Sequence, residues 1–114
     1  MKLEIPNSIE AEKSVIGSMF LSKYAQDRAL ETLNAESFYL EKHGKIFDAI
    51  KTLHNNQIAI DLTTVTDELK TRKILDEIGG VEYLTEILDE TPTATNVDYY
   101  IKIVNDKSIL RKLI

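Results

Sequence analysis

The sequence predicts an all-α fold, and three observations support this prediction. Apolar residues recur every three to four positions in nearly every segment, which is the period of an amphipathic helix rather than of a strand. The two prolines, Pro6 and Pro92, lie where a helix is about to begin or has ended. The chain has 114 residues, of which 43% are hydrophobic and 29% charged, as in a single folded domain. We therefore expect a compact six-helix orthogonal bundle spanning residues 1–114.

The first helix is predicted from the polar residues that precede it. Asn7 or Ser8 caps its N-terminus, and Asn7 with Glu10 three residues later has the form of a capping box. We expect this helix to run to about Leu21. Its apolar positions are Ile9, Ile16, Met19 and Phe20.

The next two helices follow from apolar spacing and from the residues that end them. Ser22 caps a second helix to about Leu33, with apolar residues four apart at Ala25, Ala29 and Leu33. The stretch "NAESFYL" is predicted as a connection. A third helix runs from about Glu41 to Asn55, where "NNQ" ends it with residues that tolerate left-handed backbone. Its apolar stripe is formed by Ile46, Phe47, Ile50, Leu53 and His54.

A fourth and a fifth helix are predicted between residues 61 and 92. Asp61 caps the fourth, whose buried side carries Leu62, Val65 and Leu69. The fifth begins near Gly80 and ends before Pro92, with a stripe formed by Val81, Leu84, Ile87 and Leu88. The pair Gly79-Gly80 stands where a positive φ angle costs glycine little. We interpret this pair as the start of a helix rather than as a phosphate-binding loop.

The sixth helix, capped by Asn96, carries two apolar faces. At roughly 100° per residue, the first face holds Val97, Tyr100, Ile101 and Val104. The second face is rotated by more than a quarter turn and holds Tyr99, Ile103, Leu110, Leu113 and Ile114. Two apolar faces indicate two packing partners, and no capping glycine or asparagine follows Ile114. We therefore expect a fragment of a longer chain whose next element is missing; the alternative is a frayed terminal helix with one broad apolar face.

Composition excludes several classes of protein. The chain has no cysteine, so disulfides, cysteine nucleophiles and thiolate metal sites are excluded. No apolar run approaches the roughly 18 to 20 residues of a membrane helix, and "MKLEIPNSIE" lacks the apolar region of a secretory signal. We therefore expect a cytoplasmic protein that has no membrane partner.

The charge is unevenly distributed along the chain. Between Lys73 and Lys102 lie seven acidic residues and no basic one. The whole chain has a net charge of −5, so the residues outside this segment have a net charge of +2. The last thirteen residues hold Lys102, Lys107, Arg111 and Lys112 against one acid, Asp106. The simplest interpretation is that the acidic segment and the basic helix each present a solvated face. A nucleic-acid-binding helical module remains an alternative, although the overall charge disfavours contact with phosphates.

No motif for phosphate or metal chemistry is present. "HGKI" supplies Gly44-Lys45 but lacks the hydroxyl residue and the upstream glycine of a P-loop. His43 and His54 are eleven residues apart on one predicted helix, which separates them by roughly 16 Å, too far for a common metal. We interpret each histidine as structurally satisfied or solvated. No catalytic, cofactor-binding or metal-binding residue is predicted, and a small enzyme is a remote alternative.

Tyr83 is the candidate recognition residue. It lies about 100° from the centre of the fifth helix's stripe, among Glu82, Glu86 and Glu90. At this position an aromatic side chain can anchor another protein. A tyrosine that covers its own core, with its hydroxyl in water, fits equally well, and the residues alone favour this second interpretation.

Five stretches closely resemble, in order and spacing, the amino-terminal domain of the bacterial replicative DNA helicase, the DnaB family. They are "IPNSIEAEKSVIGSMFL", "FYLEKHGKIFDAI", "IDLTTVTDEL", "IGGVEYLTEI" and "PTATNVDYYIKIVNDKSILRKLI". The resemblance runs from Ile5 to Ile114. It implies a hexameric, ATP-driven helicase that unwinds DNA, with a P-loop motor downstream of Ile114 that supplies the contacts to ATP, magnesium and single-stranded DNA.

The resemblance also implies partners. Amino-terminal domains of this family pair as a trimer of dimers in a collar, in which a helical hairpin makes much of the pairing contact, and they bind the carboxy-terminal, helicase-interacting domain of primase. The sixth helix would be the first arm of this hairpin, so the resemblance assigns its second apolar face to self-association. Carried over by position, the tyrosine in "GGVEYL" is Tyr83, and Ile114 matches an apolar position near the primase surface. Glu10 in "SIEAE" is a further candidate, although a capping role also explains it. The resemblance thus favours docking at Tyr83.

Overall fold

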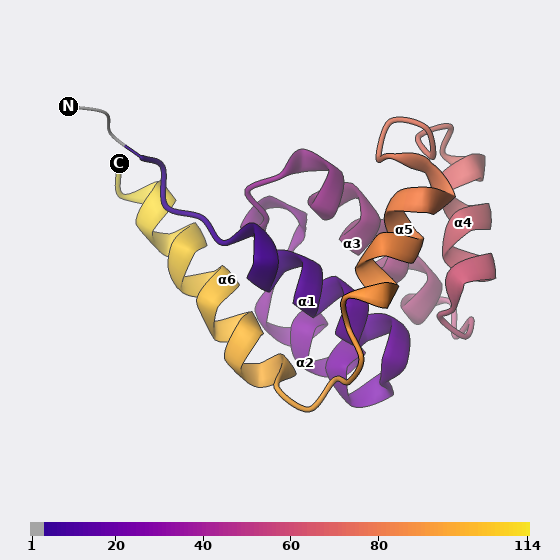
Figure 1. Cartoon of the computed structure of the whole chain (residues 1–114), viewed down its shortest axis with the longest axis horizontal. Helices are drawn as coiled ribbons and strands as arrows, with labels where there is room; N and C mark the ends of the chain where they lie inside the picture. The colour runs from indigo at the N-terminus through magenta and orange to yellow at the C-terminus, as the bar shows by residue number, and fades with distance from the viewer. Residues whose placement is uncertain (1–3) are drawn as a thin grey trace.

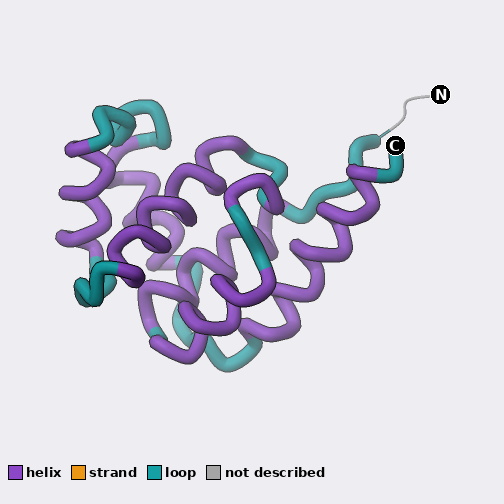
Figure 2. Tube along the Cα trace, turned by 180° about the vertical axis from the view of Figure 1, so that it is seen from behind, coloured by secondary structure: helices purple, strands orange, loops and turns teal. Residues whose placement is uncertain are grey.

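The computed structural model describes residues 4–114, which form six α-helices and one short 3₁₀ helix (Figures 1 and 2). The α-helices are α1 (Ile9–Leu21), α2 (Lys23–Thr32), α3 (Glu41–Asn55), α4 (Leu62–Thr71), α5 (Gly80–Asp89) and α6 (Val97–Lys112). The 3₁₀ helix η1 (Ala35–Ser37) lies within the predicted connection. The six predicted helices are thus confirmed, with ends within a few residues of those expected.

Side-chain caps begin several of these helices, and at the first helix one of the two predicted capping residues takes this role. Ser8, in extended backbone, accepts the N–H of Ala11 and starts α1 at Ile9. The predicted capping box of Asn7 and Glu10 is wrong, because the Asn7 amide donates instead to the carbonyl of Ile5. Capping boxes do occur at two other starts, where Asn34 pairs with Ser37 and Asp61 with Thr64.

Helix α1 lies at the centre of the fold and packs against α2, α3, α5 and α6, as Figure 1 shows. The predicted core positions Ile16 and Met19 are fully buried, whereas Ile9 is 40% exposed and does not join them. From α3, the predicted Ile46, Phe47, Ile50 and Leu53 are buried. The core therefore forms where the stripes of α1 and α3 meet the shorter helices.

Helix α5 starts at the glycine pair, as predicted. Gly79 and Gly80 have φ angles of +109° and +75°, which other residues adopt only with strain. A Cβ atom on Gly79 would lie 2.8 Å from the Cβ of Tyr83, so the pair also allows close packing. The buried side of α5 includes Leu84 and Ile87, but Val81 is 37% exposed and was wrongly placed in the stripe.

Helix α6 packs along α1 and α2 with its first apolar face. Val97, Ile101 and Val104 are buried, as predicted, and Tyr100 is half-buried. The last turns of α6 lie beside the segment that precedes α1, so the described ends of the chain lie close together (Figure 2). Within residues 4–114, no helix combines the length and apolarity needed to cross a membrane.

Candidate functional site

Three polar side chains form a hydrogen-bonded chain that links α1, α3 and α5. His43 on α3 is fully buried; its Nδ1 lies 2.7 Å from Glu12 Oε1, and its Nε2 lies 2.5 Å from the hydroxyl of Tyr83. Because a carboxylate oxygen accepts, Nδ1 donates to Glu12, and in the neutral imidazole Nε2 accepts the proton of Tyr83. Both imidazole nitrogens are therefore satisfied, as the sequence analysis anticipated for this histidine.

Glu12 also holds the start of α3. Its carboxylate, which is 1% exposed, accepts the backbone N–H of Tyr39 at 2.6 Å and that of Leu40 at 3.3 Å. Together with the bond from His43, these contacts give the buried carboxylate three donors. Such compensation is needed because an unpaired buried charge is very costly.

Tyr83 is bound more tightly to its own domain than its position at the rim of the stripe suggests. Its ring stacks on that of His43, with centres 5.8 Å apart and planes 13° apart, and the Lys42 ammonium lies 3.7 Å from the ring centre. Burial raises the pKa of the Tyr83 hydroxyl, while the nearby Lys13 opposes this shift. Only part of the ring therefore remains accessible to another protein.

Glu10 lies near Lys13, which in turn lies near the ring of Tyr83. It lines a hollow of about 350 Å³ together with Lys13, Ser14, Glu90 and Thr91. The Lys13 ammonium lies 3.0 Å from Glu86, 2.7 Å from Glu90 and 5.9 Å from the ring centre of Tyr83. Its pKa is raised, chiefly by the hydrogen bond to Glu90. We call the surface formed by Glu10, Lys13, Tyr83, Glu86 and Glu90 the α1–α5 surface.

The second face of α6 is exposed over most of its length. Tyr99 is 64% exposed, and Leu110, Leu113 and Ile114 are 46%, 78% and 83% exposed. Ile103 differs from these residues, because it is half-buried and packs against the core of its own domain. We call Leu110, Leu113 and Ile114 the α6 end.

The structure does not bring all three candidate partner-binding residues together. Glu10 and Tyr83 both border the α1–α5 surface, whereas Ile114 lies at the far end of α6, well away from α5 in Figure 1. The molecule is 44 Å long. The candidate residues therefore form two separate surfaces.

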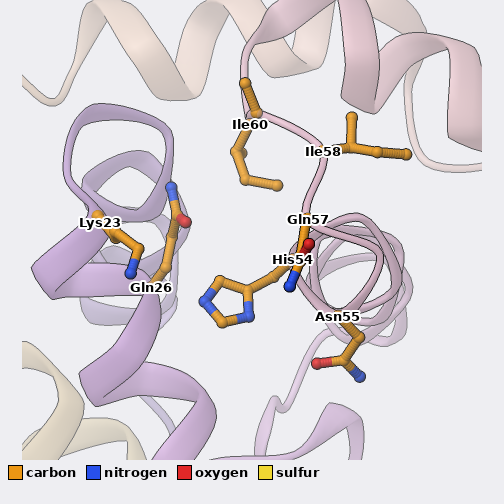
Figure 3. Close-up of a pocket in the computed structure, with 8 residues that line it drawn as sticks. Lys23, Gln26, His54, Asn55, Gln57, Ile58 and Ile60 are labelled. Carbon is orange, nitrogen blue, oxygen red and sulfur yellow. The ribbon is translucent and has the colours of Figure 1, made fainter.

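A larger groove lies elsewhere, between the start of α2, the end of α3 and the loop before α4 (Figure 3). It encloses about 830 Å³ and is lined by Lys23, Gln26, His54, Asn55, Gln57, Ile58, Ala59 and Ile60. The His54 imidazole points into it and lies 2.9 Å from a carboxylate oxygen of Asp27. None of the predicted site residues lies in this groove.

Sequence reasoning missed Glu12 and the link between His43 and Tyr83. A signal for both buried residues was present. Glu12 stands three and four residues before the buried Val15 and Ile16, and His43 stands three and four residues before the buried Ile46 and Phe47. A polar residue at helical spacing from two core positions lies on the buried face and needs a polar partner there.

Comparison with known proteins identifies the family. Residues 4–106 match the family model described as the DnaB-like helicase N terminal domain. The chain belongs to this family. The resemblance inferred from the sequence motifs is thereby confirmed, and the matched region lies outside the catalytic ATPase domain of these helicases.

Curated relatives with similar sequences are replicative DNA helicases. The chain is 47% identical over 109 residues to the replicative DNA helicase DnaC of Bacillus subtilis, and 50% identical over 109 residues to the replicative DNA helicase DnaB of Geobacillus stearothermophilus. Each alignment covers 96% of this chain but only 24% of the relative. The chain thus spans about a quarter of the length of these helicases.

Solved structures share the fold. The N-terminal domain of DnaB helicase from Mycobacterium tuberculosis superposes with a TM-score of 0.93 at 41% identity, covering 96% of this chain and 80% of that one. The N-terminal domain of DnaB helicase from Helicobacter pylori, described together with its interactions with primase, gives a TM-score of 0.74 at 22% identity. This second alignment covers 91% of this chain and 80% of the other and supports the fold alone.

Proposed function

We propose that this chain is the non-catalytic amino-terminal domain of a replicative DNA helicase, in which it supports collar assembly and docks primase. The observation that carries this proposal is the match of 96% of the chain to replicative helicases at 47% to 50% identity. In this proposal, ATP, magnesium and single-stranded DNA are bound by the remainder of the helicase. A part in DNA replication also assigns the chain to the bacterial cytoplasm.

Primase docking is assigned to the α1–α5 surface. This surface offers a partly exposed aromatic ring and several carboxylates, which suit a partner that carries both apolar and basic side chains. The carboxy-terminal domain of primase is the proposed partner, and the primase interactions described for the Helicobacter pylori domain supply the precedent. Ile114 is part of the same proposal only if primase spans the molecule or contacts two chains.

Calorimetric titration with the cognate primase's carboxy-terminal domain tests the docking proposal. Glu10→Lys reverses an exposed charge at the α1–α5 surface and is expected to weaken binding about tenfold or more, the range of an interface contact worth more than 1 kcal/mol. Glu31→Lys makes the same charge change on α2, away from that surface, and serves as the control. Absence of binding by the wild type, or equal losses in both variants, would contradict the proposal.

Tyr83→Ala requires a control for folding. Removing the phenol deprives the buried His43 of its partner, so a loss of binding alone does not show that Tyr83 contacts primase. Leu84→Ala supplies the comparison, because Leu84 is fully buried and adjacent in sequence. If Tyr83 contacts primase, Tyr83→Ala weakens binding even at temperatures where thermal melts show both variants folded, whereas Leu84→Ala does not.

Self-association is assigned to the second face of α6. Large apolar side chains exposed together mark protein interfaces, and the α6 end is the most exposed group on this face. A second copy of the chain is the proposed occupant. In solution we expect monomer and dimer in concentration-dependent exchange, measured by sedimentation.

The alternative of a nucleic-acid-binding module has little support from the basic residues of α6. Lys102 pairs with Asp106 at 2.7 Å, and the guanidinium of Arg111 bonds two backbone carbonyls of its own domain. Phosphate contact would then fall chiefly to Lys107 and Lys112. Titration with single-stranded DNA at several salt concentrations distinguishes the two functions, because a phosphate-driven binder shows a steep salt dependence.

A further inference from the structure

The two halves of α6 are held against the domain by different kinds of contact. In the first half, Val97, Ile101 and Val104 are buried in the core. After Val104, the buried part of α6 consists of Ser108, a small polar residue that contributes little apolar area. The last turns of α6 therefore lack the hydrophobic contacts that hold the first half in place.

Arg111 supplies the contacts that the last turns otherwise lack. Its Nη1 donates to the carbonyl oxygen of Pro6 and its Nη2 to that of Ser37, both at 2.8 Å. The guanidinium carbon lies 5.6 Å from the ring centre of Tyr39. Pro6 belongs to the segment before α1, and Ser37 ends η1. One side chain thus joins α6 to two other parts of the chain.

The chemistry of these contacts is specific to arginine. Within residues 4–114, no other hydrogen bond reaches the carbonyl of Pro6 or Ser37, so Arg111 is the donor for both. A planar guanidinium presents two parallel N–H donors and stacks on an aromatic ring, whereas the lysine ammonium has neither property. A carbonyl that loses its donor while shielded from water is costly.

The position of Arg111 determines which way the α6 end points. At about 100° per residue, Arg111 lies toward the side of α6 that carries Ser108 and Val104, whereas Leu110 lies about 100° and Leu113 about 160° away from it around the helix axis. Fixing the Arg111 side chain to Pro6 and Ser37 therefore fixes the rotation of the last turns. Leu110, Leu113 and Ile114 are then directed together into solvent.

We propose that Arg111 is a positioning residue for self-association, because it holds the last turns of α6 so that the α6 end meets a second copy of this chain. This inference rests on the self-association proposed above. Arg111 does not touch the partner through its guanidinium, which is engaged by Pro6 and Ser37. Its effect on association is transmitted through the direction of the helix.

Sedimentation and amide hydrogen exchange of the whole chain test this proposal. Arg111→Met removes the donors but keeps a long side chain, and it is expected to raise the dimer dissociation constant about tenfold, as expected when roughly two hydrogen bonds are lost. It should also speed the exchange of amides in residues 108–114. Lys112→Met, one position further along α6, removes the same charge and should change neither measurement.

Arg111→Lys distinguishes charge from geometry. Lysine retains the positive charge but lacks the two parallel N–H donors of the guanidinium, so this variant should behave like Arg111→Met. Wild-type dimer affinity in Arg111→Lys would overturn the proposal. Unchanged association in Arg111→Met, or an equal loss in Lys112→Met, would also overturn it. A wild-type chain that stays monomeric at every concentration would instead contradict the proposed self-association, which separates the two failures.

Discussion

The α1–α5 surface and the α6 end are both candidate interfaces, but the fold builds them in opposite ways. At the first, Tyr83 is half-buried, and its hydroxyl continues a polar chain through His43 to the buried Glu12. At the second, Leu113 and Ile114 are 78% and 83% exposed. One candidate surface is therefore part of the folded core, and the other is attached to it through Arg111.

This difference determines how each surface responds to mutation. A residue that both satisfies a buried polar group and faces solvent affects stability and binding together, so its two roles must be separated experimentally. An exposed apolar residue with few internal contacts affects binding with little effect on stability. The unfolding free energies of matched variants at the two surfaces therefore test whether the comparison holds.

The largest loss is expected for Glu12→Ala. It removes the shared acceptor of His43, Tyr39 and Leu40, and leaving a buried donor unpaired costs about 1 to 3 kcal/mol for each group. Urea unfolding measures this loss. Glu10→Ala is the matched control, two residues earlier on α1 and exposed, with an expected change within about 0.5 kcal/mol. Similar losses for both would mean that the polar chain contributes no special stability.

Tyr83→Phe should have a smaller effect. It keeps the ring that stacks on His43 but removes the hydroxyl, leaving the buried Nε2 without its donor at a cost of about 1 to 3 kcal/mol. Tyr99→Phe makes the same chemical change at a residue that is 64% exposed and should be nearly neutral. If the two variants unfold at the same urea concentration, Tyr83 is not part of the core network.

Alkaline pH should weaken the fold through the same hydroxyl. Burial raises the pKa of Tyr83 above its usual 10.0, so its stabilising contribution is complete below about pH 10 and is lost as pH rises through the raised pKa. Unfolding free energies measured on both sides of pH 10 should fall less in Tyr83→Phe than in the wild type. Tyr24, whose pKa is raised by its hydrogen bond to Asp98, is present in both proteins and cancels. If the unfolding free energies of the two proteins fall equally with pH, Tyr83 does not contribute to the loss of stability.

The smallest change in stability is expected for Leu113→Asp, although it should strongly affect association. Leu113 is 78% exposed, so its replacement should change the unfolding free energy of the monomer by about 0.5 kcal/mol or less. Sedimentation should show a shift to monomer, because a carboxylate would be buried in the proposed dimer. A stable dimer of this variant would show that the α6 end is not the interface.

Much of the fold was predictable because helical periodicity and capping are local. The bounds of α3 were predicted as Glu41–Asn55, and the cap at Asp61 was also anticipated. The errors were local: Asn7 and Glu10 do not form the predicted capping box at the start of α1, and Val81 lies outside the buried side of α5. At the start of α1, two adjacent polar residues suited the capping role, and Ser8 is the one that caps the helix.

The candidate surfaces were only partly predictable. The second face of α6 follows from residue spacing alone, and four of its five residues are exposed as that spacing suggested. Tyr83 was recognised as a residue at the edge of a stripe, yet its partner His43 lies 40 positions away in the sequence. No local pattern indicates which buried histidine meets which tyrosine.

The sequence by itself determined the helices, the family and the presence of a second apolar face on α6, because each depends on residues that are close together in the chain. Only the tertiary structure decided how polar groups pair across the core. Glu12 and His43 are 31 positions apart, and Arg111 reaches across 105 positions to the carbonyl of Pro6. Such bonds form only where packing brings distant segments within hydrogen-bonding distance and shields them from water.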